Sequence, residues 1–204
     1  MTNQQNQIYS LSEYHSVSMP KKEAIHTSAL SPEYALLGLL AESPAHGYEL
    51  HQVLAADLGQ VWHLSLSHTY NILNRLETQG YIAGSLQEQE KLPARRLFHL
   101  TEAGRERFET WLGSTSGSSV RSVRLEFLTR LYFARRLDPP RARALIEAQI
   151  SETRRGLERL HKLQESVPVG QHINRLGLEL RIRQLESILE WLEGCRQLVD
   201  EAPI

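Results

Sequence analysis

The side chains best suited to specific molecular contacts are concentrated in residues 65–82. Tyr70, Leu73 and Leu76 recur every three positions, so we expect a short helix that buries them on one face. Its outer face then shows hydroxyl, imidazole, amide and guanidinium groups, which is how a DNA recognition helix is built. The alternative is an ordinary amphipathic surface helix. The candidate contact residues are Ser65, Ser67, His68, Thr69, Tyr70, Asn71, Asn74 and Arg75.

Both ends of this helix carry recognisable signals. The hydroxyl of Ser65 or Ser67 can accept a hydrogen bond from the free backbone N–H groups of the first turn. Gly80 stands where the end of a helix favours a residue in the left-handed conformation. These signals predict a helix over residues 65–79.

The flanking sequence favours the recognition-helix interpretation. Two short segments with strand-like composition enclose a polar stretch, which predicts a hairpin with a long tip. Apolar residues at helical spacing predict two helices upstream and one downstream, the last capped by Thr101. This order is that of a winged helix-turn-helix: two helices, a recognition helix, a hairpin and a further helix. The expected elements are 33–42, 48–58, 65–79, strands 81–86 and 96–100, and 102–112.

Four segments resemble the N-terminal domain of PadR-family transcriptional regulators over residues 31–112. They are Leu36–Leu40 (LLGLL), His46–Leu50 (HGYEL), Trp62–Leu76 and Leu97–Gly104 (LFHLTEAG). The resemblance implies that helix 65–79 enters the major groove and that hairpin 81–100 lies along the backbone or the minor groove. One departure matters: the family often has Pro-Gly where this chain has His68-Thr69, so an operator sequence is not carried over.

The overall composition is that of a soluble protein: 204 residues, 41% hydrophobic and 23% charged. A single cysteine, Cys195, excludes an internal disulfide framework. No apolar run approaches the roughly 20 residues that a membrane span needs. Residues 1–30 lack the apolar core of a signal peptide and predict a flexible arm. A bacterial, cytoplasmic protein is therefore expected.

The charge balance does not by itself suggest a partner made of nucleic acid. The net charge is −1, and residues 31–112 hold six Lys and Arg against ten Asp and Glu, a net −4. A DNA-binding face therefore requires that cations be separated from acids. We expect Arg75, Lys91, Arg95 and Arg96 to gather on the recognition helix and wing, with the acids on the earlier helices. Four cations per subunit predict modest affinity that needs a dimer.

The C-terminal part, residues 113–204, is predicted to consist of a linker and long helices. Residues 113–119 are rich in Ser and Gly and predict a hinge-like linker. Helices are expected over 120–137, 141–164 and 173–199, with apolar stripes too wide for one neighbour, so a second subunit is expected to cover them. The predicted fold is mainly α with a small β-hairpin: a winged helix-turn-helix followed by long C-terminal helices that form a dimerisation arm. The predicted domains are 1–30, 31–114 and 120–204.

The chain carries no motif for an enzyme or a cofactor. It has no Gly-rich phosphate loop, and the pairs His46/His51 and His63/His68 have the wrong spacing for a metal site on one helical face. Cys195 is expected to be a core or interface residue. In PadR-like regulators small molecules bind between the winged domain and the dimer helices. Trp62, Trp111 and Trp191 are candidates for such an effector pocket, and a core position is the alternative for each.

The sequence thus predicts a homodimeric DNA-binding transcriptional repressor that a small-molecule effector releases. Arg75 and the polar residues at the helix start would contact base edges in a double-stranded operator, while Lys91, Arg95 and Arg96 would hold phosphates. Two recognition helices would enter major grooves ~34 Å apart. The effector would favour a dimer geometry that no longer fits. The alternative is a winged-helix protein-interaction adaptor without sequence-specific DNA binding.

Overall fold

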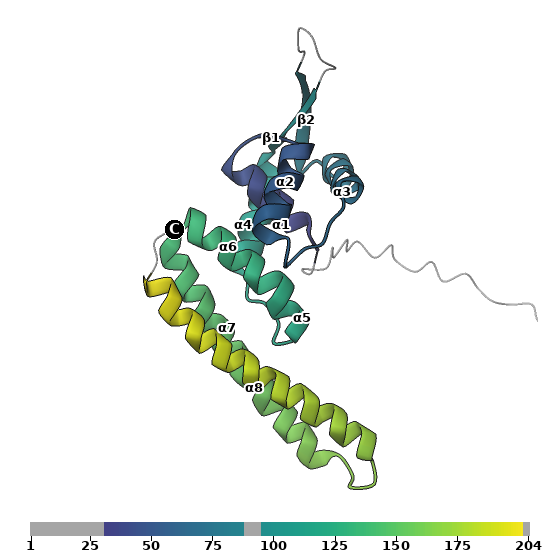
Figure 1. Cartoon of the computed structure of the whole chain (residues 1–204), viewed down its shortest axis with the longest axis vertical. Coiled ribbons are helices and arrows are strands. Elements are labelled where there is room, and N and C mark those ends of the chain that lie inside the picture. The colour runs from purple at the N-terminus through teal and green to yellow at the C-terminus, as the bar shows by residue number, and fades with distance from the viewer. Residues whose placement is uncertain (1–30, 88–94, 202–204) are drawn as a thin grey trace, which may run out of the picture.

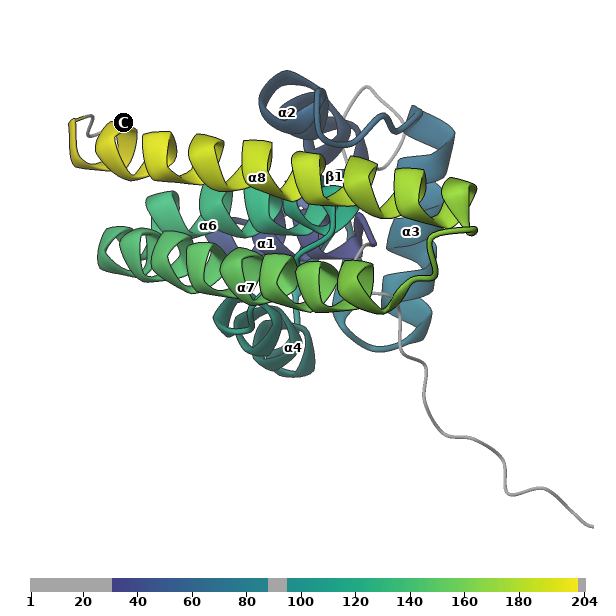
Figure 2. The same ribbon diagram turned by 90° about the horizontal axis from the view of Figure 1, so that it is seen from below.

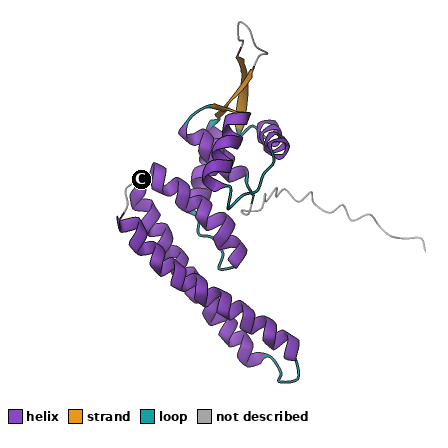
Figure 3. Cartoon of the chain, viewed as in Figure 1, coloured by secondary structure: helices purple, strands orange, loops and turns teal. Residues whose placement is uncertain are grey.

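The computed structural model describes residues 31–87 and 95–201, with side chains as far as Arg196. The molecule is elongated: the hairpin and α3 lie toward one end, and the paired helices α7 and α8 form the other (Figure 1). The expected arm, 1–30, and the candidate phosphate contact Lys91 lie outside the described residues. Helices dominate the fold and the strands are confined to one small sheet (Figure 3).

The winged part contains four helices and three short strands among the described residues. The strands form an antiparallel sheet in the order β1-β3-β2. β1 was not expected from the sequence, because two residues show no periodicity; Ala45 pairs with Phe98 of β3 and thereby joins the wing to the start of α2. The elements are α1 (Glu33–Glu42), β1 (Ala45–His46), α2 (Gly47–Leu58), α3 (Leu66–Thr78), β2 (Ile82–Gln87), β3 (Arg95–Leu100) and α4 (Glu102–Gly113).

The predicted helix caps are confirmed. Ser65, rather than Ser67, caps α3, because its hydroxyl accepts from the backbone N–H of His68 at 3.2 Å. Gly80 has φ +76°, and the N–H of Tyr81 reaches back to the carbonyl of Leu76 at 2.9 Å, which closes the C-terminus of the helix. Both ends of α3 are therefore fixed by local sequence.

The C-terminal part begins with one continuous helical run. α5 (Val120–Ser122), the π-helical turn η1 (Val123–Phe127) and α6 (Leu128–Leu137) follow without a break, then α7 (Pro139–Ser166) and α8 (His172–Glu201). Helices α6, α7 and α8 lie side by side (Figure 2). The three helices predicted for this part are confirmed. None of the helices in 31–87 and 95–201 is long and apolar enough to cross a membrane.

The hydrophobic core is continuous between the two parts. The Phe133 ring of α6 meets Phe108 of α4 edge-on, with centroids 5.4 Å apart, and it fills the space that Gly38 of α1 leaves, where any side chain would collide with it. The same cluster of buried side chains extends to Ile150 of α7 and Leu192 of α8. Helix α6 therefore belongs to the core of both parts.

The predicted hinge between the parts is wrong for residues 114–116. The buried guanidinium of Arg130 donates to the hydroxyls of Ser114 at 2.7 Å and Ser116 at 2.5 Å and to the Trp111 carbonyl at 2.8 Å. It also pairs with the buried Glu126 at 2.6 Å. A Ser- and Gly-rich composition indicates flexibility only where no distant side chain captures the hydroxyls, and here Arg130 captures two of them.

Candidate nucleic-acid interface

The buried face of α3 is shifted by one residue from the sequence expectation. Leu73 and Leu76 are buried as predicted, but Tyr70 is 39% exposed and Thr69 is fully buried. At 3.6 residues per turn, Thr69 lies about 20° from Leu76 around the helix, whereas Tyr70 lies about 120° away. The prediction that Thr69 faces outward, and that Tyr70 faces inward, is therefore wrong.

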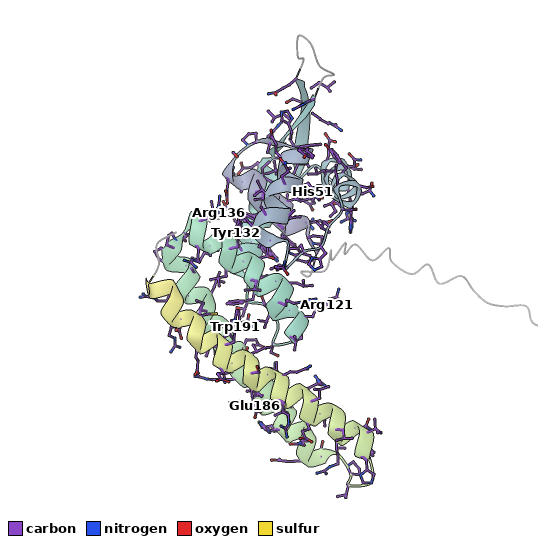
Figure 4. The ribbon with its side chains drawn as sticks, in the orientation of Figure 1. His51, Arg121, Tyr132, Arg136, Glu186 and Trp191 are labelled. Carbon is purple, nitrogen blue, oxygen red and sulfur yellow. The ribbon has the colours of Figure 1, made fainter. Side chains whose placement is uncertain are left out.

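Thr69 joins α3 to α2. Its hydroxyl donates to the Ser65 carbonyl at 3.2 Å and lies 3.2 Å from Nδ1 of His51, which Figure 4 labels beside α3. Thr69 thus holds the helix in place and is not available to a partner. The other predicted contact residues of the helix are exposed: Ser65, Ser67, His68, Tyr70, Asn71, Asn74 and Arg75.

A pocket of about 430 Å³ lies between the start of α2, the N-terminal half of α3 and the start of β3. Tyr48 at the start of α2 is 54% exposed and lines it. A methyl group at Gly47 would lie 2.6 Å from a carbon of the Tyr70 ring, so the glycine permits this ring to pack against the start of α2. Phenol hydroxyls, an imidazole and guanidinium groups suit a phosphate oxygen, while the carboxylate of Glu49 accepts a hydrogen bond from the backbone N–H of His46 at 2.9 Å. The lining residues are His46, Tyr48, Glu49, Tyr70, Arg95 and Arg96.

Arg75 is held by the protein itself. Its Nε lies 2.6 Å from Oε1 of Glu33, a side chain of α1 with no exposed surface. Arg107 of α4 contacts the other oxygen of this carboxylate at 3.1 Å. The expected separation of Arg75 from the acids of the earlier helices is therefore wrong. Glu33 ties the recognition helix to α1 and α4.

The two arginines of the wing, Arg95 and Arg96, differ in whether the protein itself holds them. Arg96 pairs with Glu77 of α3 at 2.6 Å, and its guanidinium lies 5.4 Å from the centre of the Phe98 ring. Arg95 is exposed and forms no ion pair with any residue of the described ranges. Arg95 is thus the better placed of the two to hold a phosphate.

The ion pair of Arg75 leads to a first prediction. We expect Arg75→Ala to lower the free energy of unfolding by about 1–2 kcal/mol, because buried Glu33 loses one partner while the half-exposed arginine is partly screened by solvent. Urea denaturation followed by circular dichroism measures the change. The neighbouring Asn74→Ala should leave stability unchanged. If Arg75→Ala reduced only DNA affinity, Arg75 would be a base contact after all.

The three tryptophans all contact the helical run 120–137. Trp62 is largely buried and its Nε1 donates to the Thr129 hydroxyl at 2.8 Å. Trp111 is buried against Arg130, with the guanidinium 4.6 Å from the ring centre. Trp191 is half-exposed on α8 (Figure 4). Its ring meets that of Phe127 edge-on, with the ring centroids 6.2 Å apart. Trp62 and Trp111 therefore occupy core positions, and all three connect this helix to its neighbours.

A further pocket, of about 560 Å³, lies between α2 and α6. The Tyr132 hydroxyl donates to Asp57 at 2.6 Å across it, and burial together with this carboxylate raises the pKa of Tyr132 above its ordinary value. Arg136 forms two hydrogen bonds to Glu42, at 2.7 and 2.6 Å. No sequence pattern predicts this pocket, because its residues come from two helices that are distant in the chain.

Cys195 lies in the hydrophobic core, as one of the two expectations for it has it. Within 31–87 and 95–201, no group of three or more potential ligands could hold a metal ion. Cys195 is buried, and burial raises the pKa of its thiol, whereas a redox-sensing cysteine needs a lowered pKa.

The geometry defines a winged helix-turn-helix domain, and comparison with known proteins gives the family of that domain. Residues 36–110 match the model of the Transcriptional regulator PadR-like family, and residues 123–200 match that of the Virulence activator alpha C-term. Residues 36–110 thus form a domain of the PadR-like family of transcriptional regulators.

Individual relatives span nearly the whole chain. The Negative transcriptional regulator PadR of Bacillus subtilis (strain 168) is 26% identical over 180 residues, which are 83% of this chain and 97% of the relative. The structure of Bacillus subtilis PadR in complex with operator DNA matches 82% of this chain and 98% of that chain, with a TM-score of 0.41 and 26% identity. The structure of Bacillus subtilis PadR in complex with p-coumaric acid matches 83% of this chain and 99% of that chain, with a TM-score of 0.37 and 26% identity.

Proposed function

We propose that this PadR-type regulator binds operator DNA as a homodimer, represses the gene that it controls, and is released by a small-molecule effector. One observation carries the DNA-binding proposal: the N-terminal half of α3 exposes a row of polar side chains beside an exposed Arg95, on a helix whose other face is fully buried. The similarity, over 83% of this chain, to a relative named as a negative transcriptional regulator supports repression. Such a protein acts where the chromosome is, in the cytoplasm.

The candidate contacts fall into two groups. Ser67, His68, Asn71 and Asn74 are exposed on α3 and present the donors and acceptors that distinguish base pairs in the major groove. Tyr48, Tyr70 and Arg95 line the pocket at the start of β3 and would hold a phosphate. Arg75 and Thr69 would act by positioning α3, through Glu33 and His51.

The proposed dimer uses residues that a single chain leaves uncovered. Ile173, Leu176 and Leu180 of α8 are 80%, 60% and 58% exposed. They lie along one side of the helix, while Leu178 and Ile182 face α7. We propose that residues 31–114 contact DNA and that 120–204 form the dimer, although one core joins the two parts. A two-fold axis would place two α3 helices about one DNA turn, ~34 Å, apart.

The test is selection of bound duplexes from random DNA by the full chain, followed by affinity measurements over a range of salt concentrations. We expect an inverted-repeat sequence to be enriched and the affinity to fall steeply with salt. Failure to enrich any sequence, with binding that is weak and insensitive to salt, would favour the protein-interaction adaptor, for which the net −4 of residues 31–112 is the supporting observation.

The unequal environments of the wing arginines give a second prediction. Arg95→Ala should lower affinity for operator and for random DNA alike and reduce the salt slope by about one, because one phosphate contact is lost. Arg96→Ala should have a smaller effect on affinity, because Glu77 already holds this guanidinium. Fluorescence anisotropy with both duplexes at several salt concentrations measures this. Equal losses for the two variants would contradict the assignment.

A further inference from the structure

A pocket of about 350 Å³ lies between the start of the helical run 120–137, α7 and α8. Its lining residues come from the C-terminal helices and the segment before them, and Figure 1 shows α7 and α8 at the end of the molecule away from the hairpin. Gly156 of α7 lets the linker come close, because any Cβ there would lie 2.5 Å from the Ser118 hydroxyl oxygen. The lining residues are Ser118, Ser119, Val120, Gly156, Arg159, Leu160, Leu163, Arg181, Gln184 and Leu185.

The polar groups of this pocket carry an excess of positive charge. Arg181 forms no ion pair with a residue of the described ranges. Arg159 shares Glu152 with Arg155, each at 2.9 Å, so one carboxylate serves two guanidinium groups. No Asp or Glu is among the described residues that line the pocket. The pocket therefore attracts an anion.

The other walls suit an apolar body. Leu160 and Leu185 are buried and form the inner wall, while Val120 and Leu163 are half-exposed at its edge. The hydroxyls of Ser118 and Ser119 and the amide of Gln184 add hydrogen-bonding groups. An apolar wall with a few polar groups and a guanidinium that can bind a carboxylate is the usual design of a site for a small organic acid.

The pocket between α2 and α6 is larger but offers less for recognition. Its tyrosine is already bonded to Asp57, and Arg136 is bonded twice to Glu42. A ligand there would have to displace an existing ion pair before it gained one. The pocket that contains Arg181 needs no such exchange.

We propose that the pocket formed by Ser118–Val120, Arg159 and Arg181 binds a small amphipathic organic anion, a carboxylic acid with an aromatic or aliphatic body, and that this anion is the effector. The identification as effector rests on the proposed function as a DNA-binding regulator, whereas the binding site itself does not.

The position of the pocket explains how a ligand would reach the winged part. Ser119 caps the helical run, because its hydroxyl accepts from the N–H of Ser122 at 3.1 Å. The same run carries Thr129, which binds Trp62, and Arg130, which binds the Trp111 carbonyl. A ligand that favours one position of Ser118–Val120 therefore favours one position of the helix that holds the winged part, provided that it binds the two arrangements unequally.

The test uses 8-anilino-1-naphthalenesulfonate, a fluorescent amphipathic anion, with the full chain and without DNA. We expect saturable binding that Arg181→Ala weakens by about tenfold, the loss of one charged hydrogen bond. Gln184→Glu should weaken it as well, through repulsion. The matched control is Arg183→Ala, since Arg183 is exposed on α8 and paired with Glu179 outside the pocket. Octanoate should displace the probe, and octylamine should not.

The outcomes separate the site from the function. Equal weakening by Arg181→Ala and Arg183→Ala, or equal displacement by octanoate and octylamine, would overturn the site. If octanoate binds there but leaves operator affinity unchanged in a protein that does bind operator, the effector assignment is wrong. Absence of any DNA binding, with probe binding intact, would instead refute the proposed function. Circular dichroism confirms that each variant is folded.

Discussion

Replacing Arg130 with alanine is expected to lower the free energy of unfolding by about 3–5 kcal/mol, because it leaves the buried carboxylate of Glu126 without its partner. Both side chains are almost completely buried, and they lie 2.6 Å apart within α6 and the turn before it. The same substitution removes the donors that hold Ser114, Ser116 and the Trp111 carbonyl. Guanidinium chloride denaturation of the variant and the parent measures the difference.

The control is the double variant Arg130→Met, Glu126→Leu. Removing both charges leaves no unpaired ion in the core, so most of the lost stability should return. The serines and the carbonyl still lose their donor, which keeps the double variant below the parent. A single variant that costs less than about 1 kcal/mol would mean that the carboxylate reaches solvent or a second cation.

The elements of this fold could be predicted from the sequence because their signals are local. Ser65, Thr101 and Gly80 act on backbone groups within four residues. The apolar spacing of α1, α3 and α4 needs no knowledge of the partner that covers it. The order of helices and hairpin then identified the winged fold. β1 escaped prediction because two residues give no pattern, and it is their pairing with Leu97 and Phe98, far along the chain, that makes them a strand.

The candidate site was predicted less well, because its details depend on distant charges. Nothing near Arg75 in the sequence indicates that Glu33, 42 residues earlier, is buried beside it. The burial of Thr69 depends on the exact face that α3 turns toward α2, and spacing by threes misplaced it by one residue. The linker was expected to be flexible, but Arg130 holds it from α6. Composition describes a segment alone, and these three positions are determined by what packs against them.

Two glutamates on α8 are expected to abolish the proposed dimer. In the variant Leu176→Glu, Leu180→Glu, two carboxylates per chain replace apolar side chains that are 60% and 58% exposed in the single chain. In a two-fold interface each would meet a partner's apolar surface or a like charge, and neither can be buried without a large cost. The single chain should still fold, because the side of α8 that faces α7, with Leu178 and Ile182, is unchanged.

Sedimentation velocity should show a monomer where the parent sediments as a dimer, and operator affinity should fall by about 10²–10⁴-fold, because the second half-site no longer binds at a high effective concentration. The matched control is Glu186→Gln, a substitution at an exposed position of α8 about 80° from Leu176 and about 120° from Leu180 around the helix. This control should remain dimeric and bind operator as the parent does. A glutamate variant that stays dimeric would place the interface elsewhere. One that is monomeric yet binds operator with full affinity would show that a single winged part suffices for recognition.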